Sequence, residues 1–255
     1  MHEPSILKGT NVTKCFGALR AVWKVDFEVK AGEILGIIGP NGAGKTTLLS
    51  LINGTLPLTE GEIYFKGERI SGLKPFQIAE RGISRTFQIV KPFPGMTVLE
   101  NVSIGALFGK DKMKDAREAR EKTRHILSRV GLEGKADVRV EHLNVSERKR
   151  LELARALAMD PELILLDEVM AGLNTAEVES IMELIRELNR EGRTILIIEH
   201  VMKAIMGVSH RVMVLHHGEK IAEGSPEEIR NDERVISAYL GERYAKMRGS
   251  ADVAG

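Results

Sequence analysis

Cysteine is nearly absent from the chain, because Cys15 is the single one among 255 residues. An internal disulfide and a metal site built from cysteines are therefore excluded, and one cysteine suits a reducing compartment. Long hydrophobic runs are missing too, since no stretch approaches the roughly 18 apolar residues that span a bilayer. The first residues lack the basic and apolar segments of a secretory leader. We therefore expect the protein to stay in the cytoplasm and to reach a membrane only through partners.

An excess of one charge sign is also missing. The 37 Lys and Arg residues balance 36 Asp and Glu residues, so the formal net charge is +1. Without a global basic field, the chain is not expected to bind nucleic acid. A content of 43% hydrophobic and 29% charged residues excludes a disordered chain and is typical of a soluble globular protein. The length fits one large domain, or a core domain with a smaller one attached.

The apolar runs predict an α/β fold. The first thirty residues alternate as antiparallel strands do, most clearly at residues 21–29, whereas four later runs are apolar enough to be buried on both faces. These runs are residues 33–39, 163–167, 194–200 and 211–224, the last broken by a hairpin turn. Helical patterns lie between them, at residues 46–53, 148–159 and 176–189. Strands that alternate with helices indicate a parallel sheet.

The middle of the chain has a different pattern. From residue 97 to residue 139 there is no strand candidate, and residues 98–107 and 115–130 are predicted to be helices. The second of these is dense in mixed charge, which indicates a solvated face. We therefore expect a helical insertion within the α/β core.

The strongest chemical motif is GPNGAGKTT, which begins at Gly39. It matches G-x-x-x-x-G-K-[ST], follows an apolar strand and opens a helix, as a phosphate-binding P-loop does. Glycine at 39, 42 and 44 permits backbone conformations in which N–H groups point at phosphate oxygens. Lys45 adds a charge at the β and γ phosphates, and the Thr46 hydroxyl is a ligand for Mg²⁺.

Two later strands are predicted to end in side chains that can bind a metal ion or transfer a proton. The run ELILLDE places Asp167 at the end of a buried strand, where a carboxylate can hold magnesium or its water. Glu168 follows and can polarise an attacking water, an effect worth roughly 10² to 10⁴ in rate. His200 ends the next buried strand and would reach the same crevice. A polar strand exit and a structural histidine are the simpler alternatives.

The stretch EHLNVSERKRLELARAL predicts a mostly buried helix. Asn144 or Ser146, followed by Glu147, can form its N-cap and first turn. The free N–H groups and the positive dipole end of such a helix favour a phosphate or a carboxylate. A plain capped core helix has the same pattern, so these residues alone do not decide between the two interpretations.

Taken together, these motifs resemble the nucleotide-binding subunits of ABC transporters, in the family's order and over almost the whole chain. The resemblance implies a P-loop NTPase (RecA-like) core with an N-terminal antiparallel β subdomain and an inserted helical subdomain. It implies a single ABC ATPase domain over residues 1–255. The implied parts are an α/β core with the β subdomain in 1–87 and 160–242, a helical subdomain with the signature helix in 88–159, and a frayed tail in 243–255.

The resemblance also implies roles for individual residues. Gln88 in RTFQ matches the Q-loop glutamine, ELILLDE matches the Walker B motif, AGLN matches the D-loop, and His200 matches the switch histidine. Phe16 lies where the family stacks a ring on adenine, which contributes on the order of 1 to 3 kcal/mol. The implied ATP-binding residues are Phe16, Gly39, Asn41, Gly42, Ala43, Gly44, Lys45, Thr46 and Thr47. The implied catalytic residues are Lys45, Gln88, Glu168 and His200, and the implied Mg²⁺ ligands are Thr46, Gln88 and Asp167.

The start of the EHLNVSERKR helix resembles the ABC signature, which in a head-to-tail dimer meets the γ-phosphate held by the other subunit. The usual pattern is Leu-Ser-Gly-Gly-Gln, or Leu-Ser-Tyr-Gly followed by Glu or Gln and then Gln. Here Asn144 stands for the serine, Ser146 for the second glycine and Arg148 for the glutamine. Asn144, Ser146 and Glu147 are implied to face the partner's ATP. Val169 replaces the proline that usually follows the catalytic glutamate, and we expect it to loosen the loop without loss of chemistry.

Within the family, the likeness is to the ATPase subunits of branched-chain amino acid importers. It rests on GALRAVWKVDF, RTFQIVKPFPGMTVLENV, DEVMAGLN, EHVM and AYLGE. It implies a subunit that hydrolyses ATP with Mg²⁺ in a head-to-tail dimer with an identical or similar chain. It places that subunit at the cytoplasmic face of the membrane, on integral permease subunits that are served by an extracytoplasmic substrate-binding protein.

Three alternatives to this function remain at the level of sequence. One is the ATPase of a urea-type or other amide importer. A second is a weakly hydrolysing or non-hydrolysing regulatory ABC subunit, which the altered signature residues Asn144, Ser146 and Arg148 suggest. A soluble ABC ATPase of DNA repair or translation is disfavoured, because the chain has neither a long coiled-coil insertion nor a second nucleotide domain.

Overall fold

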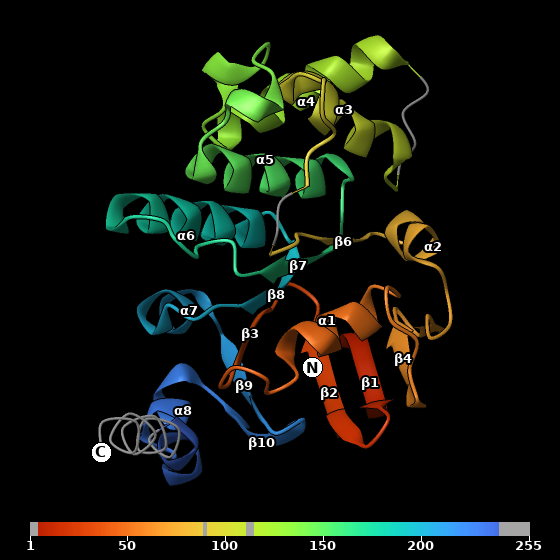
Figure 1. Cartoon of the computed structure of the whole chain (residues 1–255), viewed down its shortest axis with the longest axis vertical. Coiled ribbons are helices and arrows are strands. Elements are labelled where there is room, and N and C mark those ends of the chain that lie inside the picture. Colours follow the sequence, from red (N-terminus) through yellow and green to blue (C-terminus); the bar gives the residue numbers. More distant parts are fainter. Residues whose placement is uncertain (1–4, 89–90, 111–114, 240–255) are drawn as a thin grey trace, which may run out of the picture.

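Two sheets form the core of the chain in a computed structural model, which describes residues 5–88, 91–110 and 115–239 (Figure 1). The larger sheet has six strands in the order β10-β9-β3-β8-β7-β6. Neighbouring strands are parallel except β10, which forms an antiparallel hairpin with β9. The strands are β3 (Ile34–Ile38), β6 (Ile83–Arg85), β7 (Leu163–Asp167), β8 (Thr194–Ile198), β9 (Arg211–His216) and β10 (Glu219–Gly224).

The centre of the larger sheet is covered on both faces. Every residue of β3, β7 and β8 is buried, which explains why these sequences are apolar without alternation. On one face, Ile34 and Ile38 belong to a core that includes α6, α7 and α8; on the other, Leu35 and Ile37 pack with α1 and the smaller sheet. The predicted α/β fold class is confirmed. The helices named here are α1 (Lys45–Ile52), α6 (Thr175–Arg190), α7 (Met202–Val208) and α8 (Pro226–Asn231).

The smaller sheet is antiparallel throughout, in the order β2-β1-β4-β5. Its long hairpin closes at the pair Phe16 and Leu19. Gly17 in the turn has a φ of 59°, a left-handed conformation that glycine adopts without steric penalty. The closed end of the hairpin thereby lies beside the P-loop. The strands are β1 (Ser5–Phe16), β2 (Leu19–Lys30), β4 (Glu60–Phe65) and β5 (Glu68–Arg69).

Three helices form the upper part of the molecule in Figure 1. They are α3 (Val98–Phe108), α4 (Ala116–Arg129) and α5 (Val145–Ala158). Helix α5 contacts α3, α4 and β6, so it joins the helical pair to the larger sheet. As predicted, the described residues between 97 and 139 form no strand, and α3 and α4 begin and end within one residue of their expected limits. The short 3-10 helix η1 (Glu133–Lys135) was not predicted. Across the described part of the chain, no helix is both long and apolar enough to cross a bilayer.

Several short elements were not predicted from the sequence. Between residues 60 and 85 the structure has β4, β5, α2 (Pro75–Glu80) and β6, and α7 and α8 follow later strands. Strand β6 has three residues and helix α2 has six, which is too short for a hydrophobic period to be recognised. The tail expected to be frayed, residues 243–255, lies outside the described residues.

Candidate nucleotide-binding site

The P-loop connects β3 to α1, and its glycines are required by space as well as by backbone angle. Gly39 has a φ of 149° and Gly44 a φ of 100°. A Cβ atom on Gly39 would lie 2.1 Å from the carbonyl oxygen of Leu215, and one on Gly44 would lie 2.2 Å from that of Ala21. The loop therefore packs directly against the backbone of β9 and β2. Neither position has room for another residue type.

The lysine of the P-loop is buried within the loop. The Nζ atom of Lys45 donates to the carbonyl oxygens of Gly39 at 2.6 Å and Pro40 at 2.9 Å. These bonds hold the ammonium at the start of α1, where the helix dipole also places positive charge. The N-terminus of α1 and the Lys45 charge thus lie together at the place where a phosphate would bind.

A cavity of about 310 Å³ lies over the P-loop. Its lining includes every P-loop residue from 41 to 47, together with Phe16, Glu168 and His200. The structure therefore brings together most of the residues that the sequence singled out for ATP. Leu19, opposite Phe16 at the end of the hairpin, and Ala21 also line the cavity and were not predicted. Phe16 is 48% exposed and Leu19 66% exposed, so both offer apolar surface to a ligand.

Asp167 is fully buried and is held by an ion pair that the sequence did not predict. Its Oδ2 atom lies 2.8 Å from Nη2 of Arg85, whose side chain is 5% exposed. Its Oδ1 atom lies 3.4 Å from the Thr46 hydroxyl, and its backbone N–H donates to the Thr86 hydroxyl. Arg85 and Thr86 belong to the quoted RTFQ stretch, of which only Gln88 was assigned a role. Thr46 and Asp167 are adjacent, as expected of two ligands of one ion.

The Glu168 carboxylate contacts two other candidate catalytic residues. Gln88 Nε2 donates to one carboxylate oxygen at 2.7 Å, and His200 Nε2 lies 2.8 Å from the other. These three residues follow β6, β7 and β8, which are neighbours in the sheet, so the strand order explains their contact. The backbone of Glu168 has a φ of 54°, a left-handed conformation that is uncommon for a residue with a Cβ atom.

Glu199 is a second buried carboxylate beside this site, and the sequence did not single it out. It is 2% exposed, and Oε1 accepts from the backbone N–H of Met170 at 2.7 Å, whereas Oε2 has no hydrogen-bond partner among the described residues. Burial raises the pKa of Glu199 to about 7, although the bonds from the backbone N–H groups of Met170 and His200 act in the opposite direction. Its position directly before His200 was the only available signal.

The raised pKa of Glu199 predicts a pH-dependent stability. The folded chain binds a proton here below about pH 7, whereas the unfolded carboxyl ionises above its ordinary value of 4.5. The free energy of unfolding should therefore fall as pH rises from 4.5 to 7, by roughly 3 kcal/mol at most. Glu199→Gln should lack this decline, and urea unfolding of both chains across this pH range measures the difference. Equal pH slopes in the two chains would contradict it.

The altered signature residues cap the start of α5. The Asn144 side chain accepts from the Glu147 backbone N–H at 2.9 Å, and the Glu147 carboxylate accepts from the Asn144 N–H at 2.9 Å, which is a capping box. Arg148 turns back to the carbonyl oxygens of Leu143 and Glu141. A bond from the Ser146 hydroxyl lowers the pKa of Glu177 on α6. None of these side chains lines the nucleotide cavity of its own chain.

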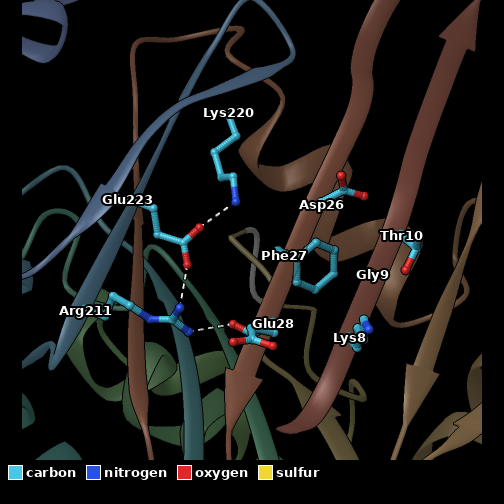
Figure 2. A pocket seen from close by; sticks show the side chains of 9 residues that line it. All are labelled: Lys8, Gly9, Thr10, Asp26, Phe27, Glu28, Arg211, Lys220 and Glu223. Carbon is cyan, nitrogen blue, oxygen red and sulfur yellow. Dashed lines mark hydrogen bonds and ion pairs between the residues drawn. The ribbon is translucent and has the colours of Figure 1, made fainter.

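A second hollow lies between the two sheets (Figure 2). Arg211 on β9 pairs there with Glu223 and donates to the backbone oxygen of Glu28 on β2. It also pairs with Glu33, which does not line the hollow. Lys220 also pairs with Glu223. These charged groups are bonded to one another, and the hollow contains no P-loop. The bonds of Arg211 therefore link the two sheets. The candidate nucleotide-binding residues line the first cavity instead.

The fold and the first cavity define a P-loop nucleotide-binding protein of the α/β class. Comparison with known proteins then gives the family. The ABC transporter family model matches residues 22–171, and a model described as the branched-chain amino acid ATP-binding cassette transporter matches residues 219–245. The chain belongs to the ABC transporter family, as its motifs predicted.

Individual relatives resemble the chain over nearly its whole length. The high-affinity branched-chain amino acid transport ATP-binding protein LivG of Escherichia coli strain K12 is 42% identical over 255 residues, covering 95% of this chain and 100% of LivG. The ADP conformation of an ABC transporter's ATP-binding cassette is 33% identical, with a TM-score of 0.84, covering 93% of this chain and 99% of that one. A dimeric bacterial ABC transporter cassette is 30% identical, with a TM-score of 0.80, covering 86% and 98%.

Proposed function

We propose that this chain is the ATP-hydrolysing subunit of an ABC importer for branched-chain amino acids. The observation that carries the proposal is the cavity in which the P-loop and Glu168 face each other. The substrate class is supported by the match of residues 219–245 and by the full-length similarity to LivG.

The groups that line the cavity, and Gln88 beside it, each have a task in this proposal. Lys45 and the P-loop N–H groups bind the phosphates and stabilise the charge that develops during hydrolysis. Glu168 orients the attacking water and accepts its proton. Gln88 and His200, which contact the two oxygens of that carboxylate, fix its orientation. Phe16 and Leu19 offer the apolar surface on which an adenine ring can stack.

Two oxygen ligands that suit a magnesium ion lie at the phosphate end of the site: Thr46 lines the cavity, and Asp167 lies buried beside Thr46. The Thr46 hydroxyl and the Asp167 carboxylate lie 3.4 Å apart and are hard ligands of the kind that Mg²⁺ prefers. Gln88 is the third proposed ligand. When bound, the ion would neutralise phosphate charge. Among the described residues no three His, Cys, Asp or Glu side chains form a metal site, so phosphate and water would supply the remaining ligands.

We further propose a head-to-tail dimer with an identical or similar chain. A dimeric structure is known for the bacterial cassette reported above. In such a dimer the start of α5, with Asn144, Ser146 and Glu147, would face the partner's ATP. The helical subdomain (88–159) would contact permease subunits and the core (1–87 and 160–242) would bind nucleotide. The complex would lie at the cytoplasmic face of the membrane and receive its substrate from a binding protein.

Phosphate release from Mg-ATP tests the proposal, together with ATP-driven leucine uptake in Escherichia coli cells that lack LivG. Glu168-dependent release and restored uptake are the expected results. Phosphate release without leucine uptake would identify an ATPase that works with a different permease or a different substrate from those of LivG.

A repaired signature distinguishes an active subunit from a regulatory one. The triple variant Asn144→Ser, Ser146→Gly and Arg148→Gln should hydrolyse ATP faster than the parent, by less than about tenfold. We expect so small a gain because the parent helix α5 is already capped, so the repair does not have to create its first turn. A tenfold change in rate is the size of effect that one hydrogen bond can have. Phosphate release by both chains, with Glu168→Gln as the inactive control, makes the comparison. Activity confined to the repaired chain would instead identify a regulatory subunit that binds ATP without completing its partner's site.

A further inference from the structure

Lys149 reaches from α5 to the two loops that carry the candidate catalytic groups. Its Nζ atom donates to the main-chain carbonyl oxygen of Glu168 at 2.8 Å and to that of Gln88 at 3.3 Å. The side chains of these two residues already meet at 2.7 Å. An ammonium group has three donors, and its bonds are stronger than those of neutral groups. One charged group thus links the signature helix, the Q-loop residue and the catalytic carboxylate.

The backbone of Glu168 needs such a restraint. Its left-handed φ of 54° persists in a residue with a Cβ atom only where the surroundings enforce it. On the N-terminal side, the N–H group of Glu168 donates to Ile198 on β8 at 3.0 Å. On the C-terminal side, the carbonyl group accepts from Lys149. The residue is therefore held from both directions, once by the sheet and once by α5.

We propose that Lys149 is a positioning residue for ATP hydrolysis and that it couples the signature helix to the catalytic glutamate. The inference rests on the proposed function, because it takes Glu168 as the catalytic carboxylate. Helix α5 begins at Val145, within the signature, so a displacement of its first turn carries Lys149 along. A contact between the signature and the partner's nucleotide thereby changes the orientation of Glu168 in the chain's own site.

The test separates catalysis from binding. Lys149→Met should lower kcat for ATP hydrolysis by about 10- to 100-fold, since a displacement of about 1 Å in a catalytic group can cost 10² in rate. The KM for ATP and the Kd of a fluorescent ATP analogue should stay within about threefold, because Lys149 does not line the cavity. Lys149→Arg should restore most of kcat, because a guanidinium group can also donate to both carbonyl oxygens. Lys149→Gln, with a neutral donor, should be intermediate.

Arg150→Met is the matched control. Arg150 is the next residue of α5, and its guanidinium group donates to the backbone oxygen of Val130 and to the Ser180 hydroxyl on α6. This variant should keep kcat near the parental value. A parental or higher kcat in Lys149→Met, an equal loss in Arg150→Met, or no rescue by Lys149→Arg would overturn the positioning role. Absence of Glu168-dependent phosphate release in the parent would instead overturn the proposed function on which the inference rests.

Discussion

Glu168→Gln is expected to lower kcat for ATP hydrolysis by about 10² to 10⁴ while ATP still binds. The amide keeps the size of the carboxylate and can still contact Gln88 and His200, which lie at 2.7 and 2.8 Å from the present oxygens. It cannot accept a proton from water. The loss should therefore appear in kcat, with the Kd for ATP within about threefold of the parent. Phosphate release and equilibrium binding of a fluorescent ATP analogue measure the two quantities.

A second variant checks that Glu168, and not the neighbouring carboxylate Glu199, is the proton acceptor. Glu199→Gln removes a carboxylate that is buried beside the same loop and is not in the cavity lining. Its kcat should stay within about tenfold of the parental value. If Glu168→Gln kept more than a tenth of the parental kcat, or if Glu199→Gln lost as much, another group would have to be the base.

The second large effect concerns stability. Asp167→Leu should lower the free energy of unfolding by about 3 to 5 kcal/mol, because it leaves the buried guanidinium group of Arg85 without its carboxylate. The other acceptors of Arg85 Nη1, the Ser50 hydroxyl at 3.0 Å and Asn53 Oδ1 at 3.4 Å, are neutral and too weak to compensate. For a chain of this size such a loss corresponds to a fall of roughly 10 °C in Tm. Urea unfolding followed by circular dichroism measures it.

The double variant Asp167→Leu with Arg85→Met is the control for this prediction. Removing both charges also removes the cost of an unpaired ion, so most of the lost stability should return. The double variant should remain inactive, because the proposed magnesium ligand is still missing. If the single and double variants were equally unstable, packing at Asp167 rather than charge pairing would be the cause. In both cases an Asp167 variant is less stable than the parent. An activity assay of such a variant must therefore be accompanied by a measurement of its folding.

Much of the fold was predictable because its signals are local. The runs that became β3, β7 and β8 are apolar at every position, and this pattern identifies strands covered on both faces. The contact between Glu168 and His200 was also predictable, since side chains that follow adjacent parallel strands meet at one edge of the sheet. The nucleotide cavity therefore follows largely from sequence order and strand adjacency.

The unpredicted parts depend on contacts between distant segments. Strand β6 exists because three residues pair with β7, and no period can be read from three residues. Arg85 belongs to the site only because this edge strand places it beside Asp167. Lys149 and Glu199 act on backbone groups, Glu168 C=O and Met170 N–H, which the sequence does not distinguish from any others. These residues were visible in the motifs, but their partners were not.

The bonds of Lys45 within its own loop have a consequence for ligand selectivity. Its ammonium group already has two carbonyl acceptors, Gly39 and Pro40. An anion that takes Lys45 as a partner must compete with them. Inorganic phosphate can form only a few hydrogen bonds in place of these two, whereas in the proposed binding mode a nucleoside triphosphate would also bind the remaining loop N–H groups and stack its base on Phe16. We therefore expect the loop to disfavour free phosphate relative to a nucleoside triphosphate, because the two carbonyl oxygens that hold Lys45 compete with either anion.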